Sequence, residues 1–222
     1  EAYLVGGCVR DALIGRTPKD WDVTTNATPE EIQALFPDSY YTNDFGTVGV
    51  LRETENESLK IIEVTPYRTE SEYSDKRRPD AVTFGQNLEE DLARRDFTVN
   101  AIAYDESKGQ IIDPYKGQSD LSLKVLRTVG VPEERFEEDA LRLMRAVRLV
   151  AELEFALDTE TAAAISLKAS NLAHVSRERI RDEFVRILNS SQPMMALVLS
   201  EQLGLLEYIA PDLRRGIGVE QN

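Results

Sequence analysis

Hydrophobic and polar residues are patterned differently in the two parts of this chain. Up to about residue 125, short apolar runs broken by turn residues predict strands at 46–51, 59–65, 99–104 and 110–113. Helices are expected at 9–14 and at 29–35, the second capped by Thr28 with Glu31 at capping-box spacing. Beyond residue 125, apolar residues recur at helical spacing and predict helices at 133–152, 158–170, 176–190, 193–201 and 205–209. The pattern therefore predicts an α+β chain, with an α/β head over residues 1–125 and an all-α region over residues 126–222.

Composition narrows the class of protein. The chain has 222 residues, of which 41% are hydrophobic and 30% charged, as expected for one or two globular domains. No apolar run approaches the roughly 20 residues that span a bilayer, and no signal-peptide pattern opens the chain, so we expect a cytoplasmic protein without a membrane partner. Cys8 is the single cysteine and His174 the single histidine, which excludes an internal disulfide and a zinc cluster. We expect Cys8 to pack as a small apolar side chain and His174 to have a capping or surface role.

Net charge argues against a firm hold on RNA, because phosphate contacts supply much of the binding energy for nucleic acids. The formal net charge is −14. Basic residues nevertheless cluster at 76–78, 94–95, 142–148 and 177–186. The distribution predicts locally positive grooves on an acidic body.

The most informative chemistry lies in residues 4–25. The glycine pair Gly6 and Gly7 reads as a turn into a helix, where backbone N–H groups and the guanidinium of Arg10 can hold phosphate oxygens. Asp20 and Asp22 are two residues apart, so on a strand their carboxylates project from one face, with Trp21 on the other. Two convergent carboxylates favour a Mg²⁺ site, although two acids on a solvated strand edge have the same spacing. The segment predicts a site for a metal-bound nucleoside triphosphate.

This segment closely resembles the first motif of the polymerase-β-like nucleotidyltransferases, in the branch of bacterial-type (class II) CCA-adding tRNA nucleotidyltransferases and poly(A) polymerases. The resemblance implies a nucleotidyltransferase head with a small mixed sheet and flanking helices, followed by a helical neck that selects the base. It also implies Mg²⁺ as cofactor, CTP and ATP as substrates, and the tRNA 3′ end as acceptor, with pyrophosphate released. Family members are longer, so we expect that the body and tail regions that hold tRNA are absent from this chain.

A third carboxylate is expected to complete the metal site, because two-metal phosphoryl transfer needs ligands for both ions. Glu63 lies within the apolar strand predicted at 59–65, and a charge in such a strand usually has a partner or a metal. The resemblance favours this catalytic role, since the family carries an acid ahead of an arginine like Arg68. The alternative is an edge-strand glutamate that faces water.

Residues 94–103 match the second motif of the family. Arg95 can bind phosphate oxygens in a bidentate manner, and Asp96 and Asn100 can bond sugar hydroxyls. The alternative is a charged helix end that leads into a buried strand. Residues 112–121 resemble the third motif, which we interpret as an architectural turn.

The helix predicted at 133–152 resembles the base-selecting motif of the neck. Asp139 and Arg142, three residues apart, are expected to be neighbours on its surface, and the family uses this pair as a protein template for the base. A carboxylate accepts from the amino group of cytosine or adenine, and a guanidinium donates to the ring acceptors. Arg145 and Arg148 are expected to meet the triphosphate. The alternative is a solvated charged face with one weak ion pair; residues 175–183 resemble the fifth motif and are expected to brace this helix.

Specificity within the family stays open at this point. A polar segment between residues 69 and 87 occupies the place of the loop implicated in adding the final A, which favours A-addition. A poly(A) polymerase, a CC-only or A-only enzyme, or, more remotely, a non-catalytic RNA-binding remnant are the alternatives.

Overall fold

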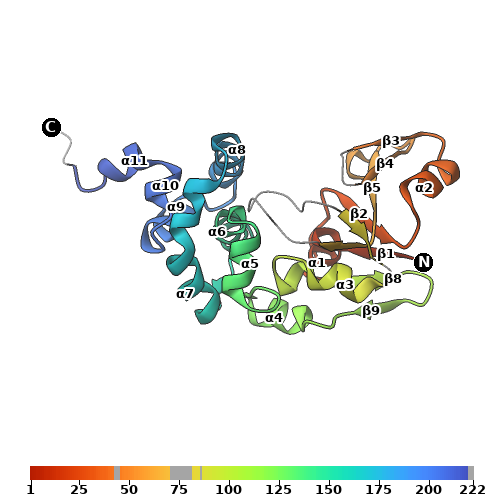
Figure 1. Cartoon of the computed structure of the whole chain (residues 1–222), viewed down its shortest axis with the longest axis horizontal. Helices are drawn as coiled ribbons and strands as arrows, with labels where there is room; N and C mark the ends of the chain where they lie inside the picture. The colour runs from red at the N-terminus through yellow and green to blue at the C-terminus, as the bar shows by residue number, and fades with distance from the viewer. Residues whose placement is uncertain (43–45, 71–81, 86, 220–222) are drawn as a thin grey trace. The chain divides into compact units, whose positions relative to one another are not determined.

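The computed structural model of the chain describes residues 1–42, 46–70, 82–85 and 87–219. They form two compact units, which divide between Ser122 and Leu123 and are described here one at a time. Figure 1 follows the chain from the strand-rich first unit to the helical second unit.

A mixed sheet forms the centre of the first unit. Among the described residues, seven strands are ordered β3-β4-β5-β2-β1-β8-β9. Their bounds are Ala2–Val5 (β1), Trp21–Thr25 (β2), Ser39–Tyr41 (β3), Val48–Leu51 (β4), Ile61–Pro66 (β5), Ala103–Asp105 (β8) and Gln110–Ile112 (β9). Only β2 and β5 pair in parallel within this sheet, and the other neighbours are antiparallel. A separate antiparallel pair joins β6 (Arg68–Glu70) to β7 (Val82–Phe84).

Helices and 3₁₀ turns connect these strands. They are α1 (Gly7–Leu13), α2 (Pro29–Leu35), η1 (Glu57–Leu59), α3 (Leu88–Ala93), η2 (Thr98–Asn100) and α4 (Gly117–Leu123). The capping box predicted for α2 is confirmed, because Thr28 and Glu31 bond to each other's backbone N–H groups. The strand predicted at 99–104 is wrong over its first half, where η2 lies. A short buried apolar run has the same pattern in either conformation, so periodicity did not separate them.

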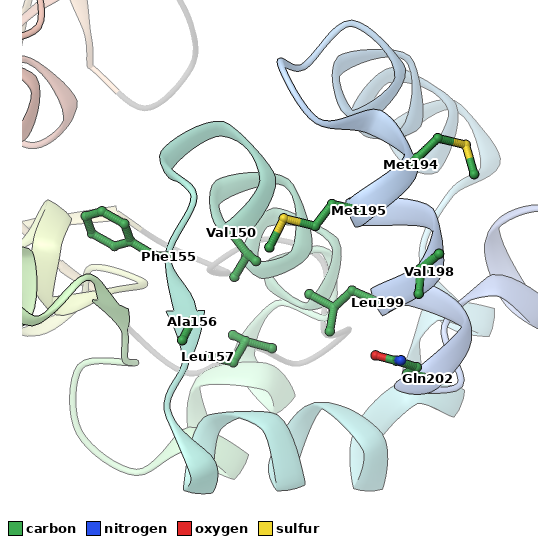
Figure 2. Close-up of a pocket in the computed structure, with 9 residues that line it drawn as sticks. All are labelled: Val150, Phe155, Ala156, Leu157, Met194, Met195, Val198, Leu199 and Gln202. Carbon is green, nitrogen blue, oxygen red and sulfur yellow. The ribbon is translucent and has the colours of Figure 1, made fainter.

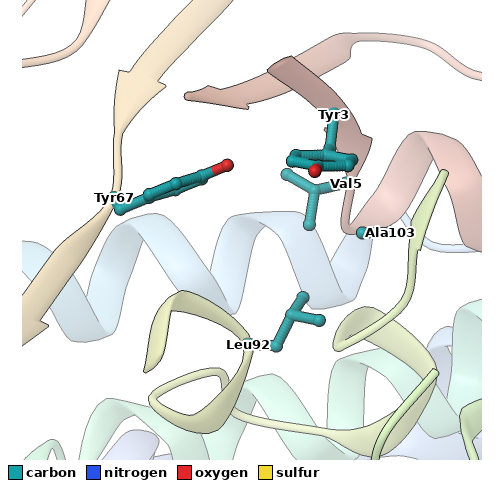
Figure 3. Close-up of a cluster of buried hydrophobic side chains, with 5 residues drawn as sticks. All are labelled: Tyr3, Val5, Tyr67, Leu92 and Ala103. Atoms are coloured by element: carbon teal, nitrogen blue, oxygen red, sulfur yellow. The ribbon is translucent and has the colours of Figure 1, made fainter. Parts of the chain in front are cut away.

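Strand alternation divides the apolar side chains between the two faces of the sheet. On one face, Ile32 of α2 packs with Val48, Val50 and Val64. On the other, Tyr3, Val5, Tyr67, Leu92 and Ala103 form a second cluster, with Leu92 reaching it from α3 (Figure 3). Because β1 and β2 are in register, Asp22 lies on the face of Tyr3 and Val5.

The turn at residues 112–121 has an architectural role, as predicted. The Asp113 carboxylate accepts from the backbone N–H groups of Gly117 and Gln118 at 2.7 and 2.9 Å. A Cβ at Gly117 would lie 2.3 Å from the carbonyl oxygen of Thr98, so only glycine lets α4 approach η2 this closely. The side chains of Thr98 and Asp120 add a buried hydrogen bond between the same two elements.

The second unit is helical, with one short strand pair. The helices are α5 (Pro132–Glu138), α6 (Leu141–Leu153), α7 (Thr159–Lys168), η3 (Ala169–His174), α8 (Arg177–Leu188), α9 (Pro193–Gln202), α10 (Leu206–Ile209) and α11 (Pro211–Arg215). The strands β10 (Val125–Leu126) and β11 (Ala156–Leu157) pair in parallel. This pair was not predicted, since two residues are too few to show a period.

The single helix predicted at 133–152 is wrong, because the chain breaks between α5 and α6. Asp139 has extended backbone angles, φ −145° and ψ 104°, and its carboxylate accepts from the backbone N–H of Leu141, the first residue of α6. The apolar pattern hid the break, because both helices bury apolar side chains, such as Phe136 on α5 and Leu143 on α6.

Two smaller predictions concern Cys8 and His174. Cys8 is buried behind the glycine turn, as predicted, and its thiol donates to the carbonyl of Val5 at 3.3 Å. His174 is exposed at the end of η3, which confirms its surface position. In the described part of the chain, no helix has both the length and the apolar character needed to cross a membrane.

Candidate functional site

Three carboxylates meet on the face of the sheet that carries Asp22. Asp20 ends the bend just before β2, Asp22 is the second residue of that strand, and Glu63 is directly opposite Asp22 on the parallel strand β5. Residues paired in a parallel ladder project from the same face, so Glu63 stands beside Asp22. Glu63 is exposed to water, but the alternative of an edge strand is wrong, because β5 lies between β4 and β2. Trp21 points to the opposite face, where it lines an apolar pocket with Leu4 and Cys8.

Burial and like charge act together on Asp22. Its partial burial, with the neighbouring charges of Asp20 and Glu63, raises the pKa of Asp22 to about 6, against a lowering by Arg95. The direction shows that the folded chain resists holding this carboxylate as an anion. A cation placed among the three acids would relieve the repulsion.

The donor set fits a divalent cation that the substrate helps to bind. Within the described ranges, no group of three or more His, Cys, Asp or Glu side chains is arranged to hold a metal by protein ligands alone. Mg²⁺ typically takes one or two carboxylates and completes its shell with water and substrate phosphates. Asp20 and Asp22 are the two carboxylates that could supply the protein's share of such a shell.

Arg95 lies directly beside these acids, over the backbone of Gly6. A Cβ on Gly6 would be 2.7 Å from Arg95 Nη1 and 3.7 Å from Asp22 Oδ2, and Gly6 has a positive φ of 81°. Arg95 Nη2 donates to Asp91 Oδ2 at 3.2 Å, and its Nη1 donates to the carbonyl oxygen of Asn100 at 3.4 Å. Gly6 is therefore required both by its backbone conformation and by the arginine that packs on it.

Arg10 is positioned by a second chain of hydrogen bonds. Its Nη1 donates to Asn100 Oδ1 at 2.7 Å, and Asn100 Nδ2 donates to Asp96 Oδ1 at 3.1 Å. Asp96 and Asn100 are each 8% exposed. The structure thus joins the first and second motifs through Arg10 and Asn100, and it commits the Asn100 amide to fixing Arg10. Gly7 lies beside this guanidinium, since a Cβ there would be 3.6 Å from Arg10 Nη2.

The predicted base-reading residues are in the second unit, and they do not pair with each other through their side chains. Arg142 is 8% exposed, and its Nη1 donates to Glu138 Oε2 at 2.5 Å and to the carbonyl of Arg135 at 3.1 Å. Asp139 accepts from Arg179 Nη2 at 2.7 Å. The expectation that Asp139 and Arg142 are neighbours on the surface of one helix is wrong, because Asp139 precedes α6 and Arg142 is buried. The alternative, an ion pair between the two on a solvated face, is wrong as well, since each side chain bonds to another partner.

Arg145 and Arg148 lie further along α6. Arg145 is half-buried. Arg148 Nε donates to Glu183 Oε1 at 2.5 Å, and its Nη1 donates to both oxygens of Glu152. Glu183 and Arg179 come from α8, so residues 175–183 brace α6 as predicted.

Sequence reasoning missed three residues whose side chains bond to predicted site residues and orient them. Asp91 pairs with Arg94 and Arg95 at helical spacings of three and four, a signal that was readable in the sequence. Glu138, four residues before Arg142, was readable in the same way. Arg179 was not, because it reaches Asp139 from forty residues away. The segment between residues 69 and 87, predicted as the loop for A-addition, falls mostly on 71–81 and 86, outside the described residues.

The second unit also contains an apolar groove of about 440 Å³ between α9 and β11 (Figure 2). It is lined by Val150, Phe155, Ala156, Leu157, Met194, Met195, Val198, Leu199 and Gln202. No charged side chain lines it, and the only polar side chain among these lining residues is that of Gln202.

Comparison with known protein families gives two matches. Residues 2–127 match the family described as the poly A polymerase head domain. Residues 154–216 match the family described as the probable RNA and SrmB-binding site of polymerase A.

Individual proteins with similar sequences and structures carry the comparison further. The chain is 49% identical over 210 residues to the CCA-adding enzyme of Geobacillus kaustophilus, a match that covers 94% of this chain and 50% of that enzyme. The crystal structure of the Bacillus stearothermophilus CCA-adding enzyme in complex with CTP is similar with a TM-score of 0.84 and 46% identity, over 94% of this chain and 49% of that one. A tRNA nucleotidyltransferase complexed with a primer tRNA and an incoming ATP analog has a TM-score of 0.78 and 28% identity, over 100% of this chain and 60% of that one. The chain spans about half the length of the curated relatives it matches.

Proposed function

We propose, on the premise that this chain belongs to the poly A polymerase head domain family, that it adds C and A nucleotides from CTP and ATP to the 3′ end of tRNA without a template. The observation that carries the proposal is the meeting of Asp20, Asp22 and Glu63 on one face of the sheet beside Arg95. Membership in the family implies the use of a divalent metal ion. We propose Mg²⁺ for this role, because the donors are carboxylates alone.

The reaction is nucleotidyl transfer. The 3′ oxygen of the RNA bonds to the α-phosphorus, the bond from that phosphorus to the bridging oxygen breaks, and pyrophosphate leaves. Mg²⁺, when bound, favours ionisation of the attacking hydroxyl and offsets charge on the triphosphate. Asp20 and Asp22 would hold the ion, with Glu63 as the third acid. Arg95 and Arg10 would neutralise phosphate oxygens of the triphosphate. Gly6 and Gly7 would leave space for these phosphates, because they carry no side chain. Asp96 and Asn100 would bond the sugar hydroxyls or hold Arg10 in position.

The second unit is proposed to select the base. Asp139 would accept from the amino group shared by cytosine and adenine, and Arg142 would donate to the neighbouring ring acceptor. Arg145 and Arg148 are assigned to the triphosphate. Arg148 is paired with Glu183, so binding the triphosphate would require Arg148 to leave this partner. We accordingly propose residues 1–125 as the catalytic head and 126–222 as the base-selecting neck.

Addition of C and A is favoured over the alternatives by two neighbours. One is a CCA-adding enzyme in complex with CTP, and the other holds a primer tRNA and an ATP analog. A poly(A) polymerase, a CC-only or an A-only enzyme stays the alternative, and the retained acid cluster disfavours an inactive remnant. Since tRNA is the proposed acceptor, the cytoplasm is the proposed location.

The test is incubation of the chain with Mg²⁺, each triphosphate and a tRNA that lacks its 3′ end, with products resolved by length. We expect C and then A to be added, and Asp22→Asn to lower the rate at least about a thousandfold, because the metal loses a ligand at the reacting centre. The control is Glu106→Gln, an exposed carboxylate in the turn after β8.

The outcomes separate the candidate functions. A long A tract would identify a poly(A) polymerase, and failure with ATP a CC-only enzyme. Substantial Mg²⁺-dependent incorporation by Asp22→Asn would overturn the metal assignment.

A further inference from the structure

Exposed apolar side chains lie on the same face of the sheet as the acids. Gly49 of β4 is opposite Glu63 of β5, and Leu51 is opposite Ile61 two residues along, so both pairs project from the face of Glu63. Tyr40 of β3 is opposite Gly49 and projects from this face as well. The side chains of Tyr40, Leu51 and Ile61 are 41%, 48% and 44% exposed. These three residues are called the apolar patch below.

Tyr40 extends toward the acids across the strand beside it. A Cβ on Gly49 would lie 2.8 Å from Tyr40 Cζ and 3.1 Å from the hydroxyl oxygen of Tyr40. The tip of the ring therefore covers Gly49, which has no side chain to displace it. Glu63 is the next position across the sheet and Asp22 the one after, at about 4.8 Å per strand. The ring thus lies at the border of the acid cluster.

Packing within the unit explains this ring poorly. β3 is at the edge of the sheet, and the residue that fastens it to the rest of the unit is Tyr41. Tyr41 is opposite Val48 on the other face, where its hydroxyl donates to Glu30 of α2 at 3.2 Å. Tyr40 is instead directed to the water-facing side, next to two further apolar side chains. Adjoining apolar side chains that face water are typical of a binding surface.

The apolar patch and the arginines lie on opposite sides of the acids. On one side of β2 is β1, which leads into Gly6 and the guanidinium of Arg95 above it. On the other side is β5 with Glu63, and beyond it lies the apolar patch. The arginines suit the triphosphate, whose oxygens are charged. An apolar surface suits the terminal nucleoside of the acceptor, which has a base and a ribose but no phosphate on its 3′ oxygen.

An aromatic ring also suits a site whose occupant changes. After each addition a different nucleotide ends the acceptor, so a subsite that read the hydrogen bonds of one base would reject the next. Stacking on an aromatic ring accepts every base, because each base has a π face. Tyr40 supplies such a ring, and the aliphatic side chains of Leu51 and Ile61 have no donors or acceptors with which to select a base.

We propose that the apolar patch is the subsite for the terminal nucleoside of the RNA acceptor, with the terminal base stacked on Tyr40 and its 3′ oxygen directed to the acids. The inference rests on the proposed function, since it assumes transfer of a nucleotide to an RNA end. Leu51 and Ile61 extend the apolar surface beside the ring.

The test compares the full chain with Tyr40→Ala and Tyr40→Phe. The matched control is Tyr41→Ala, which changes the next residue of the same edge strand on the opposite face. Two acceptors are used: a tRNA that ends in one C, and the same tRNA with an abasic ribose at its 3′ end. The quantities measured are kcat and the KM values for acceptor and CTP in the addition of one nucleotide. Sedimentation gives the oligomeric state of each protein.

We expect Tyr40→Ala to raise the KM for the tRNA about tenfold and to leave the KM for CTP unchanged, because the terminal base loses its stacking partner. Tyr40→Phe keeps the ring and is expected to restore most of the lost affinity. On the abasic acceptor, Tyr40→Ala should raise the KM no further, because the base that would stack is already absent. Tyr41→Ala should keep the KM values of the unmodified chain.

The results that overturn the inference are distinguishable from a failure of the proposed function. If the unmodified chain adds C and Tyr40→Ala has the same KM for tRNA, the apolar patch is not the acceptor subsite, while the proposed function stands. The same holds if Tyr40→Ala raises the KM equally for both acceptors, because the ring then does not contact the base. Loss of a dimer in Tyr40→Ala with unchanged kinetics assigns the patch to contact between copies of the chain. If the unmodified chain transfers no nucleotide, the proposed function fails and the inference fails with it.

Discussion

Single residues in the first unit connect the backbone to the acid cluster. Gly6 shows this most directly, because the space that its missing side chain leaves is occupied by Arg95. Arg95 in turn lowers the pKa of Asp22, against the effect of burial and of the neighbouring acids. One backbone position therefore controls the placement of the positive charge that balances the site.

Gly6→Ala is expected to damage the site beyond its effect on stability. The backbone of Gly6, with φ 81° and ψ −135°, is one that residues with a Cβ rarely adopt, and it would cost such a residue about 1–3 kcal/mol. The methyl group would also displace Arg95, because it would lie 2.7 Å from Arg95 Nη1. A displacement of about 1 Å near the reacting groups can lower the rate of nucleotide incorporation about a hundredfold. Urea unfolding and single-nucleotide addition to tRNA measure the two effects.

Gly15→Ala is the matched control for this variant. Gly15 has a similar φ of 73°, but no atom lies within 4 Å of the position its Cβ would take. Gly15→Ala should lose some stability, because its φ is also positive, and keep its activity. Equal activity of the two variants would show that Arg95 need not lie over Gly6.

The acids on β2 were predictable from the sequence, whereas their partners were only partly so. Asp20 and Asp22 belong to one local segment, and the alternation of a strand is enough to bring them together. That Glu63 stands opposite Asp22 depends on the pairing of two strands about forty residues apart, which no local period encodes. Resemblance to the family pointed to Glu63 as the third acid. Its position opposite Asp22 is seen only in the structure.

At the scale of elements, Asp91 joins the end of α3 to the two arginines that follow it, and Arg95 continues to the carbonyl oxygen of Asn100 in η2. The side chain of Asp91 is fully buried between Arg94 and Arg95, at 2.6 and 3.2 Å. Burial alone would raise the pKa of Asp91, but the charges of Arg95 and Arg94 outweigh it and hold the pKa below its usual value. A carboxyl group of this kind stabilises the fold above its unfolded-state pKa of roughly 4, and the contribution is lost as the pH falls through the lower, folded-state pKa.

Asp91→Asn is accordingly expected to destabilise the chain in a pH-dependent way. Near pH 7 the loss is expected to be about 3 kcal/mol, because two arginines keep their charge without a counter-ion. The difference in unfolding free energy between the two proteins should shrink as the pH falls below about 4. Urea unfolding over pH 3 to 7 measures it.

Glu57→Gln provides the comparison for this experiment. Glu57 forms an ion pair with Lys60 at the same spacing of three residues, but both side chains are exposed. It should have little effect at any of these pH values. A difference for Asp91→Asn that stays constant over the whole range would rule out the charge explanation.

In the second unit, the boundary between α5 and α6 was not predictable from the apolar pattern. The helix broken at Asp139 illustrates the reason, since the apolar side chains continue across the break and only the backbone changes. The cap that Asp139 forms with Leu141 spans two residues and leaves the helical period intact. The pairing of Asp139 with Arg179 is tertiary, so the interpretation of Asp139 and Arg142 as surface neighbours could not anticipate it.

For the whole molecule, a net charge of −14 disfavours the binding of a polyanion such as RNA. The chain also spans about half the length of its curated relatives. The proposed binding of tRNA by this chain would therefore rest on local contacts from basic residues. Such contacts release counter-ions, which makes their strength depend on salt.

We expect the affinity for tRNA to fall roughly tenfold or more between 50 and 200 mM salt, as a few phosphate contacts would give. The affinity for CTP should change much less, because its phosphates are bound within the site rather than along a charged surface. Fluorescence anisotropy with labelled tRNA and calorimetry with CTP measure the two. An affinity for tRNA that does not depend on salt would point to a mainly non-ionic contact.

The parallel register of β2 and β5 has a consequence for how errors in folding are tolerated. A slip of β5 by one residue would turn Glu63 toward Ile32, Val48 and Val50, and so place a charge in the apolar cluster while removing it from Asp22. The same mistake would therefore lower the stability and remove the third acid together. Selection for a stable fold would therefore also keep Glu63 opposite Asp22.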